Sequence, residues 1–318
     1  MRIGTRGSAL ALAQAGHVAK LLGAQPPAVG AGDPIELVTI RTSGDSGDSA
    51  APRRSPGGTP ADKSRWVDTI EAALLAGEID LAVHSAKDVP GELAEGLALL
   101  GAPVRAAAED VLCGAEDLES LPEGACVGTG SLRRAAQLRA AREDLRVVAI
   151  GGNVDTRLRR LGEEEDLDAI MLAHAGLLRL GRAAEVGGVL DPARFVPAPG
   201  QGALALEGRI GDTRAEAAVR AIADADAFAC LRAERAVAHE LDASCHTPLG
   251  AHAVPAGCGC LQLRVWVGLP DGSAWVSDEL LGGFYDPEAL GYRAAERMKA
   301  AGAEQILHRA EELAVEHA

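Results

Sequence analysis

Residues 83–90 combine side chains that can do chemistry directly after a short apolar run. The run leads into His84, Ser85, Lys87 and Asp88, and a proline closes it. A carboxylate in this place can stabilise a developing cation or move a proton. Two unit charges about 4 Å apart interact by about 4 kcal/mol at an effective dielectric of about 20, so Asp88 is a candidate catalytic group. The alternative is a solvated loop with an internal Lys–Asp pair.

Two further stretches combine glycine-rich turns with arginines. Residues 128–134 contain Ser131, a candidate helix N-cap, followed by Arg133 and Arg134. Residues 151–157 repeat this construction and end in an arginine. The free N–H groups of a helix start and nearby guanidinium groups bind anions. Two such sites predict a ligand with several carboxylates, and the alternative is a pair of surface helices with solvated arginines.

Residues 241–250 place a thiol, Cys245, on a predicted turn beside His246. A cysteine in this setting can be a nucleophile. It can also be a buried, inert side chain, or part of a metal cluster with His252, Cys258 and Cys260. The spacing matches no standard structural zinc pattern, and we predict no metal.

The polar stretches lie where predicted strands end, and ligands of α/β proteins bind at the carboxyl ends of strands. Ser8 is the predicted N-cap of the first helix. Strand–helix alternation predicts mostly parallel sheets covered by helices. The strands are predicted at residues 2–5, 35–40, 79–83, 125–129, 145–150, 168–172 and 203–207, and the helices over 63–76 and from near Ser131, Asn153 and Ala173.

The C-terminal third predicts a small α+β domain. A helix over residues 225–241 precedes strands near 245–254, 261–267 and 273–279, and one helix over 287–312 closes the chain. Residues 44–62, rich in Gly, Ser, Pro and Asp, predict a loop, and the Pro-Ala-Pro-Gly stretch at 197–200 predicts a hinge. No internal repeat is visible in the sequence.

Composition limits the function classes. The 318 residues predict two or three domains, and the formal charge of −15 disfavours nucleic acid and anionic membranes as partners. The N-terminal residues lack the apolar core of a signal peptide. Six scattered cysteines predict reduced thiols. We therefore expect a cytoplasmic protein that is a monomer and acts on an anionic small molecule bound by locally clustered arginines.

Six motifs in order resemble the hydroxymethylbilane synthase (porphobilinogen deaminase) family. They are residues 5–8, 84–90, 128–134, 152–157, 199–203 and Cys245, and the resemblance covers essentially the whole chain. It implies an α/β fold with two periplasmic-binding-protein-like lobes, each with a mixed sheet, and a smaller C-terminal α+β domain. The implied domains are 1–103 with 203–220, then 104–202, then 225–318.

The resemblance also implies the activity. Such a transferase polymerises four porphobilinogen units head to tail, with loss of ammonia, in porphyrin and heme biosynthesis. The chain grows on a dipyrromethane cofactor held by a thioether to Cys245, and Asp88 stabilises the cationic azafulvene formed from the substrate. By the same resemblance, the residues that bind cofactor and substrate are Arg6, Ser8, Lys63, Ser85, Lys87, Thr129, Ser131, Arg133, Arg134, Arg157, Arg179 and Gln201.

Four positions depart from the family pattern. Gly151 stands where the family has an arginine of the substrate site, and Trp66 stands where a phenylalanine is usual. Residues 104–110 keep one arginine, Arg105, but lack the acidic and proline residues that the family usually has before the last Asp of this stretch. Residues 53–58 differ from the usual lid loop, which carries Gly and Lys. These departures leave two alternatives: a divergent member that makes a shorter or altered oligopyrrole, and a non-catalytic protein that binds anionic pyrroles. The presence of Asp88 and Cys245 argues against the second.

Overall fold

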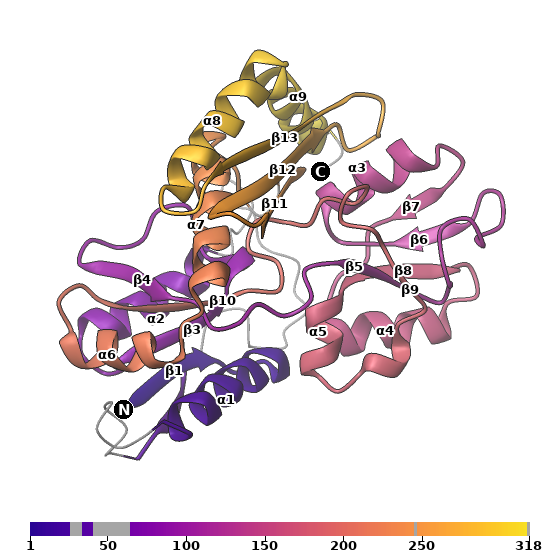
Figure 1. The fold of residues 1–318 in the computed structure, drawn as a ribbon. Coiled ribbons are helices and arrows are strands. Elements are labelled where there is room, and N and C mark those ends of the chain that lie inside the picture. Colours follow the sequence, from indigo (N-terminus) through magenta and orange to yellow (C-terminus); the bar gives the residue numbers. More distant parts are fainter. Residues whose placement is uncertain (26–33, 41–63, 245–246, 317–318) are drawn as a thin grey trace. The chain divides into compact units, whose positions relative to one another are not determined.

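The computed structural model describes residues 1–25, 34–40, 64–244 and 247–316 (Figure 1). The chain forms two compact units. Unit 1 comprises Met1–Arg105 and Ala203–Phe228, and unit 2 comprises Ala106–Gly202 and Ala229–Ala318. None of the helices within the described ranges is long and apolar enough to cross a membrane. The three domain boundaries expected from the sequence stay predictions.

Unit 1 is built around a five-stranded sheet. Its strands are β1 (Arg2–Arg6), β2 (Glu36–Ile40), β3 (Leu81–Ser85), β4 (Leu97–Gly101) and β10 (Leu204–Arg209). They lie in the order β2-β1-β3-β10-β4. β1 is parallel to β2 and β3, whereas β10 is antiparallel to β3 and β4. The sheet is therefore mixed, and the expectation of a mostly parallel sheet was wrong because β10 comes from a distant part of the chain.

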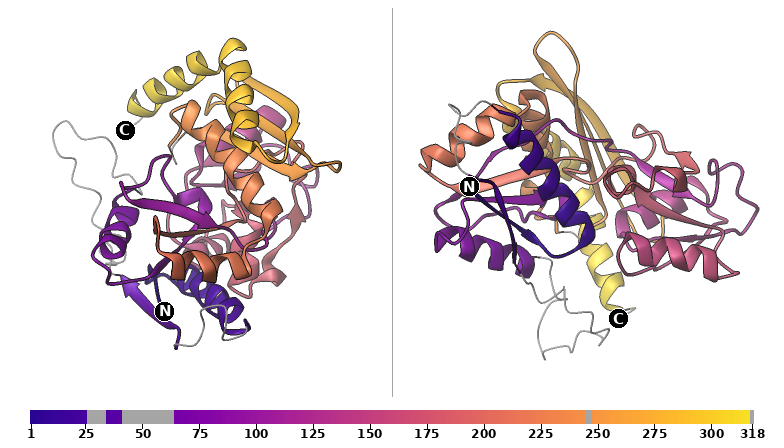
Figure 2. Two further views of the ribbon diagram at one scale, coloured as in Figure 1. Left: turned by 60° about the vertical axis from the view of Figure 1, so that its left-hand side comes forward. Right: turned by 90° about the horizontal axis from the view of Figure 1, so that it is seen from below.

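Helices cover both faces of this sheet. They are α1 (Ala9–Gly23), α2 (Ser64–Leu75) and α6 (Thr213–Ile222). On one face, Val83 and Leu206 pack with Val18 of α1 and Val219 of α6. The other face packs against α2, and the right-hand view of Figure 2 shows α1 lying along the strands. Ser8 caps α1 as predicted, because its hydroxyl accepts a hydrogen bond from the N–H of Ala11.

Unit 2 contains a second five-stranded sheet with an equivalent strand order. Its strands are β5 (Asp110–Cys113), β6 (Cys126–Gly128), β7 (Arg146–Val148), β8 (Ala169–Ala173) and β9 (Gly188–Val189), in the order β7-β6-β8-β5-β9. β6 is parallel to β7 and β8, and β5 is antiparallel to β8 and β9. Its helices are α3 (Leu132–Ala141), α4 (Val154–Glu163) and α5 (His174–Arg179). Leu138 of α3 packs on one face, and Leu158 of α4 and Leu177 of α5 pack on the other.

The C-terminal part of unit 2 is a three-stranded antiparallel sheet with helices. The strands β11 (Leu249–Pro255), β12 (Cys260–Gly268) and β13 (Trp275–Gly283) share one core with α8 (Pro287–Ala300), α9 (Ala303–Glu316) and the part of α7 (Ala225–Glu240) that begins at Ala229. The single closing helix predicted over 287–312 was wrong. Gly302, with φ of +101°, lies between α8 and α9, and this left-handed backbone ends the first helix. The α/β fold class with a smaller C-terminal α+β domain is confirmed.

Candidate active site

One edge of the unit 2 sheet collects most of the predicted binding residues. β6, β7 and β8 are parallel, so the segments that follow them leave from the same edge. β5 is antiparallel to β8 and places its first residue, Asp110, opposite Ala173, the last residue of β8. Asp110 therefore lies at the edge where Thr129 and Ser131 follow β6 and His174 follows β8.

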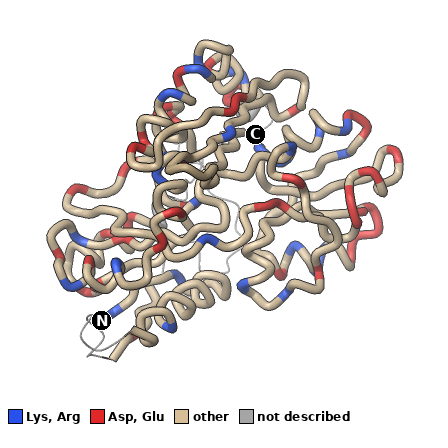
Figure 3. Tube along the Cα trace, in the orientation of Figure 1, with Lys and Arg blue, Asp and Glu red and all other residues tan. Residues whose placement is uncertain are grey.

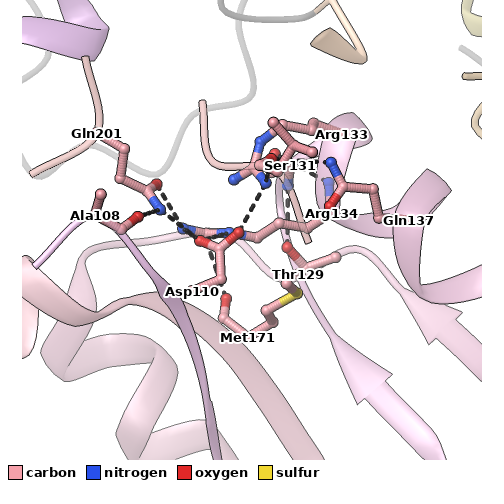
Figure 4. A network of polar contacts seen from close by, with 10 residues as sticks. Ala108, Asp110, Thr129, Ser131, Arg133, Arg134, Gln137, Met171 and Gln201 are labelled. Atoms are coloured by element: carbon pink, nitrogen blue, oxygen red, sulfur yellow. Dashed lines mark hydrogen bonds and ion pairs between the residues drawn. The ribbon is translucent and has the colours of Figure 1, made fainter. Parts of the chain in front are cut away.

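Asp110 is the centre of a buried polar network at this edge (Figure 4). Its Oδ2 accepts a hydrogen bond of 2.7 Å from Nη1 of Arg133, and its Oδ1 accepts one of 2.9 Å from Nε of Arg134. Nε2 of Gln201 donates to the same Oδ1 at 2.8 Å. Burial opposes ionisation of Asp110, but the charges and hydrogen bonds of the two arginines outweigh it and lower the pKa of this carboxyl.

Arg133 and Arg134 are interior side chains, not solvated ones. Their exposed fractions are 2% and 5%, so the alternative of surface arginines was wrong. Arg133 also donates to the carbonyl of Val196, and Arg134 donates to the carbonyl of Met171. The sequence did not single out Asp110 as their partner; a lone acidic residue heading the apolar strand 110–113 is the signal that could have shown it. Direct contact of these two arginines with a ligand stays a prediction.

The starts of α3 and α4 present backbone donors at the same edge. Ser131 caps α3 by accepting from the N–H of Arg134, and Asn153 caps α4 by accepting from the N–H of Thr156. Thr129 is buried, and its Oγ1 accepts from the N–H of Ser131. The first N–H groups of each helix that remain without an intrahelical partner can bind an anion.

Arg157 and Arg179 are the two partly buried cations of this region. Nε of Arg157 donates to the carbonyl of Gly152, and its guanidinium lies over Gly130, where a Cβ would be 3.4 Å from Nη2. Nη2 of Arg179 donates to the carbonyl of Gly202 at 2.7 Å. Within the part of the chain that the structure describes, neither forms an ion pair with a carboxylate.

Burial makes these two cations costly. It lowers the pKa of Arg157, with a smaller contribution from the charge of Arg134, and it lowers the pKa of Arg179 to about 10. A buried cation without a carboxylate partner is stabilised by an anionic ligand. The residues present therefore fit a ligand or cofactor that carries carboxylates. Acidic and basic residues are interspersed along the rest of both units (Figure 3), so this fit depends on Arg157 and Arg179 and not on the charge of a whole unit.

Unit 1 carries the predicted catalytic residue. Asp88 ends the short 3-10 helix Ala86–Asp88, which directly follows β3. Because β1 and β3 are parallel, Arg6 at the end of β1 and Ser85 at the end of β3 lie at the same edge of the sheet. Ser8 follows at that edge, and Oγ of Ser85 accepts a hydrogen bond of 2.7 Å from Gln14. Lys87 and Asp88 are half-buried.

Two predicted residues fall outside the described residues: Lys63 and the proposed anchor Cys245. Ser244 and Thr247 stand on either side of residues 245–246, and the N–H of Ser244 donates to Oγ1 of Thr247 at 2.9 Å. Among the side chains that the structure places, no three of the types His, Cys, Asp and Glu are arranged to hold a metal ion.

Comparison with known proteins identifies the family. The model described as "Porphobilinogen deaminase, dipyromethane cofactor binding domain" matches residues 1–217, and the C-terminal domain of the same enzyme matches residues 228–300. The chain belongs to the porphobilinogen deaminase family. Its cofactor is a dipyrromethane, since the matched domain is the one that binds it.

Curated relatives agree over nearly the full length. The porphobilinogen deaminase of Thermus thermophilus is 42% identical over 96% of this chain and 97% of its own. That of Rubrobacter xylanophilus is 46% identical over 96% of this chain and 95% of its own. Among solved structures, the periplasmic VFT2 domain of Bordetella pertussis BvgS aligns with 70% of this chain and 86% of its own at 17% identity and a TM-score of 0.37, which is too distant to add to the argument.

Gly151 is one of the expected departures from the porphobilinogen deaminase pattern that lie among the described residues. It is exposed and lies just before α4, and a Cβ built on it would meet no atom within 4 Å. Its φ is not left-handed, so a side chain is sterically allowed there. His174, which the sequence did not single out, lies at the same edge, with Nδ1 3.9 Å from Oε2 of Glu109.

Proposed function

We propose that this chain joins four porphobilinogen molecules head to tail with loss of ammonia, as the transferase hydroxymethylbilane synthase of tetrapyrrole biosynthesis. The family match over nearly the whole chain supports this reaction. The structural observation that supports it most is at the edge of the unit 2 sheet, where the partly buried Arg157 and Arg179 have no carboxylate partner among the residues that the structure places. A substrate with an acetate and a propionate supplies the missing anions.

Asp88 is proposed as the catalytic carboxylate. Loss of ammonia from the aminomethyl group of porphobilinogen leaves a cationic azafulvene, and a carboxylate held nearby stabilises this cation. The place of Asp88 supports this role. Asp88 is half-buried and ends a short helix at the carboxyl end of β3, the end of a strand at which α/β proteins bind their ligands.

The arginines and helix starts are proposed to bind the carboxylates of cofactor and substrate. Arg157, Arg179 and the starts of α3 and α4 provide direct contacts, and the network around Asp110 keeps Arg134 and Gln201 in place. Cys245 is proposed to hold the cofactor by a thioether. When bound, the dipyrromethane supplies the free pyrrole carbon to which the first porphobilinogen is joined.

The mass of the purified chain tests this proposal first. A covalent dipyrromethane increment that disappears in Cys245→Ser supports it, and a bare chain contradicts it. Incubation with porphobilinogen, oxidation and ultraviolet spectroscopy then test the product, since uroporphyrin shows a tetrapyrrole. An altered spectrum favours the divergent member that makes a shorter or altered oligopyrrole, for which the open space at Gly151 is the specific observation.

We also propose that the chain acts as a cytoplasmic monomer on small molecules. The formal charge of −15 supports a small-molecule partner over nucleic acid. Native mass spectrometry of the loaded chain checks the monomer.

A further inference from the structure

A buried chain of polar side chains lies in unit 1 on both sides of the segment that carries Asp88. Nε2 of His84 is 2.9 Å from Oε2 of Glu207, and these side chains are 6% and 0% exposed. Glu71 is 6% exposed, and its carboxyl is close enough to that of Glu207 for the two groups to affect each other's charge. Oε1 of Glu71 accepts a hydrogen bond of 3.3 Å from the N–H of Ala94.

The side chains of His84, Glu207 and Glu71, together with the backbone N–H of Ala94, are called the brace below, because they connect the segments before and after Asp88. His84 is on β3, four residues before Asp88, and Glu207 is on the neighbouring strand β10. Glu207 pairs with Ala82 and His84 pairs with Ala205, so the two side chains are diagonal neighbours on one face of the sheet. Ala82 packs against α2, which carries Glu71 on this face. Ala94 lies after Asp88, so the chain connects the strand that enters the turn with the segment that leaves it.

The two buried carboxyl groups of the brace, Glu71 and Glu207, are stabilised when one of them carries a proton. A carboxylate can only accept hydrogen bonds, so Nε2 of His84 is the donor of the 2.9 Å contact whenever the carboxyl of Glu207 is ionised. Oε1 of Glu207 is buried and has no hydrogen-bond partner among the residues that the structure describes. The carboxyl of Glu71 can act as a donor toward Glu207 when it carries a proton. Burial, together with the charge of Glu207 and a smaller contribution from Asp68 of the same helix, raises the pKa of Glu71.

We propose that Glu71, Glu207 and His84 are positioning residues for Asp88, and that Glu71 acts in its protonated form as the donor that completes the brace. The proposal rests on the catalytic role proposed for Asp88. In this arrangement Glu71–H donates to Glu207, which also accepts from His84, and Glu71 accepts from the backbone of Ala94. Loss of the Glu71 proton places two carboxylates side by side in the interior and loosens the segment after Asp88.

Two substitutions of Glu71 separate positioning from simple burial. Glu71→Gln keeps a donor toward Glu207 and an acceptor toward Ala94, so it is expected to keep kcat. Glu71→Leu removes both, and we expect kcat to fall by about a hundredfold, the typical cost of a misplacement of about 1 Å. KM for porphobilinogen should change little, because Arg157 and Arg179, the arginines proposed to contact its carboxylates, belong to unit 2, whereas Glu71 belongs to unit 1. Equal kcat values for the two variants at neutral pH would contradict the positioning role.

The pH profile gives a second measurement. The raised pKa of Glu71 means that its proton is lost only above the ordinary range of a glutamate. The kcat of the unchanged protein should therefore fall as the pH rises through this raised pKa. Glu71→Gln cannot lose a proton and should keep its kcat there. If the alkaline fall is identical in the two proteins, Glu71 is not the titrating group.

Controls and a double variant separate this proposal from the proposed function. Asp68→Asn removes an exposed charge from the same helix, and Val83→Ala removes buried volume from the other face of β3; both should keep the kcat of the unchanged protein.

If Glu71 acts through Asp88, adding Glu71→Leu to Asp88→Asn should lower kcat no further. Normal turnover of Asp88→Asn overturns the catalytic role itself, whereas a slow Asp88→Asn beside a fully active Glu71→Leu overturns only the brace. If Glu71→Leu shows no cooperative unfolding transition, it is not folded and its kcat cannot be used. The pH profiles of Glu71→Gln and the unchanged protein then test the role of Glu71.

Discussion

Replacing Gly151 with arginine is expected to tighten the binding of porphobilinogen. The position has open space for a side chain, and its backbone conformation allows one. It directly precedes α4, the helix that carries Arg157, at the edge of the unit 2 sheet. Arginine binds a carboxylate through two parallel hydrogen bonds. The substitution introduces the arginine that the family resemblance implies for this position, and no atom lies within 4 Å of a Cβ built there.

The size of the effect follows from two opposing contributions. A hydrogen bond to a charged group contributes about 1.5–3 kcal/mol, and the upper value suits a bidentate pair. Ordering a long arginine side chain costs about 1.5–2 kcal/mol in rotamer entropy. The net gain is about 1–1.5 kcal/mol, which lowers KM for porphobilinogen by roughly fivefold to tenfold.

Steady-state kinetics with porphobilinogen measure this gain. Gly162→Arg is the matched control, because Gly162 is also exposed, with no atom within 4 Å of its Cβ, and lies at the opposite end of α4. An unchanged or raised KM in Gly151→Arg, with Gly162→Arg equal to the unchanged protein, would refute the idea of a vacant carboxylate site. It would instead favour another arginine in this space: Arg105, or Arg53 and Arg54, which lie outside the described residues.

Three further substitutions test the proposed roles. Cys245→Ser should give a folded chain without the dipyrromethane mass increment, whereas Cys258→Ser should keep it, because only a thiol at the anchor forms the thioether. Asp88→Asn should lower turnover by about two to three powers of ten at an unchanged melting temperature; near-normal turnover would remove Asp88 from the mechanism. Asp110→Asn should destabilise the chain by about 3–5 kcal/mol at neutral pH, since it leaves two buried arginines without their carboxylate. The lowered pKa of Asp110 means that its stabilisation is complete above the ordinary range of an aspartate and is lost as pH falls through the folded value; denaturant titrations at several pH values should show this acid loss in the unchanged protein and not in Asp110→Asn.

The sequence predicted those parts of the site that depend on neighbours along the chain. Ser8 and Ser131 cap helices as expected, and α4 starts beside Asn153 as predicted, because a cap bonds to an N–H only a few residues away. Strands end near the predicted polar stretches, although β3 ends at Ser85 rather than at Val83. The order of six motifs was enough to identify the family.

Only the tertiary structure decided which distant residues meet. Asp110 and Arg133 are 23 positions apart, and His84 and Glu207 are 123 apart. Their pairing depends on two antiparallel strands, β5 and β10, that join sheets whose other inner strands are parallel. Local propensity and periodicity carry no information on such crossovers, because they describe one segment at a time. The sequence therefore determined the residue types and local turns of the site. Burial in the folded sheets determined that Arg133 and Arg134 pair with Asp110, whereas Arg157 and Arg179 form no ion pair with a carboxylate of the described residues.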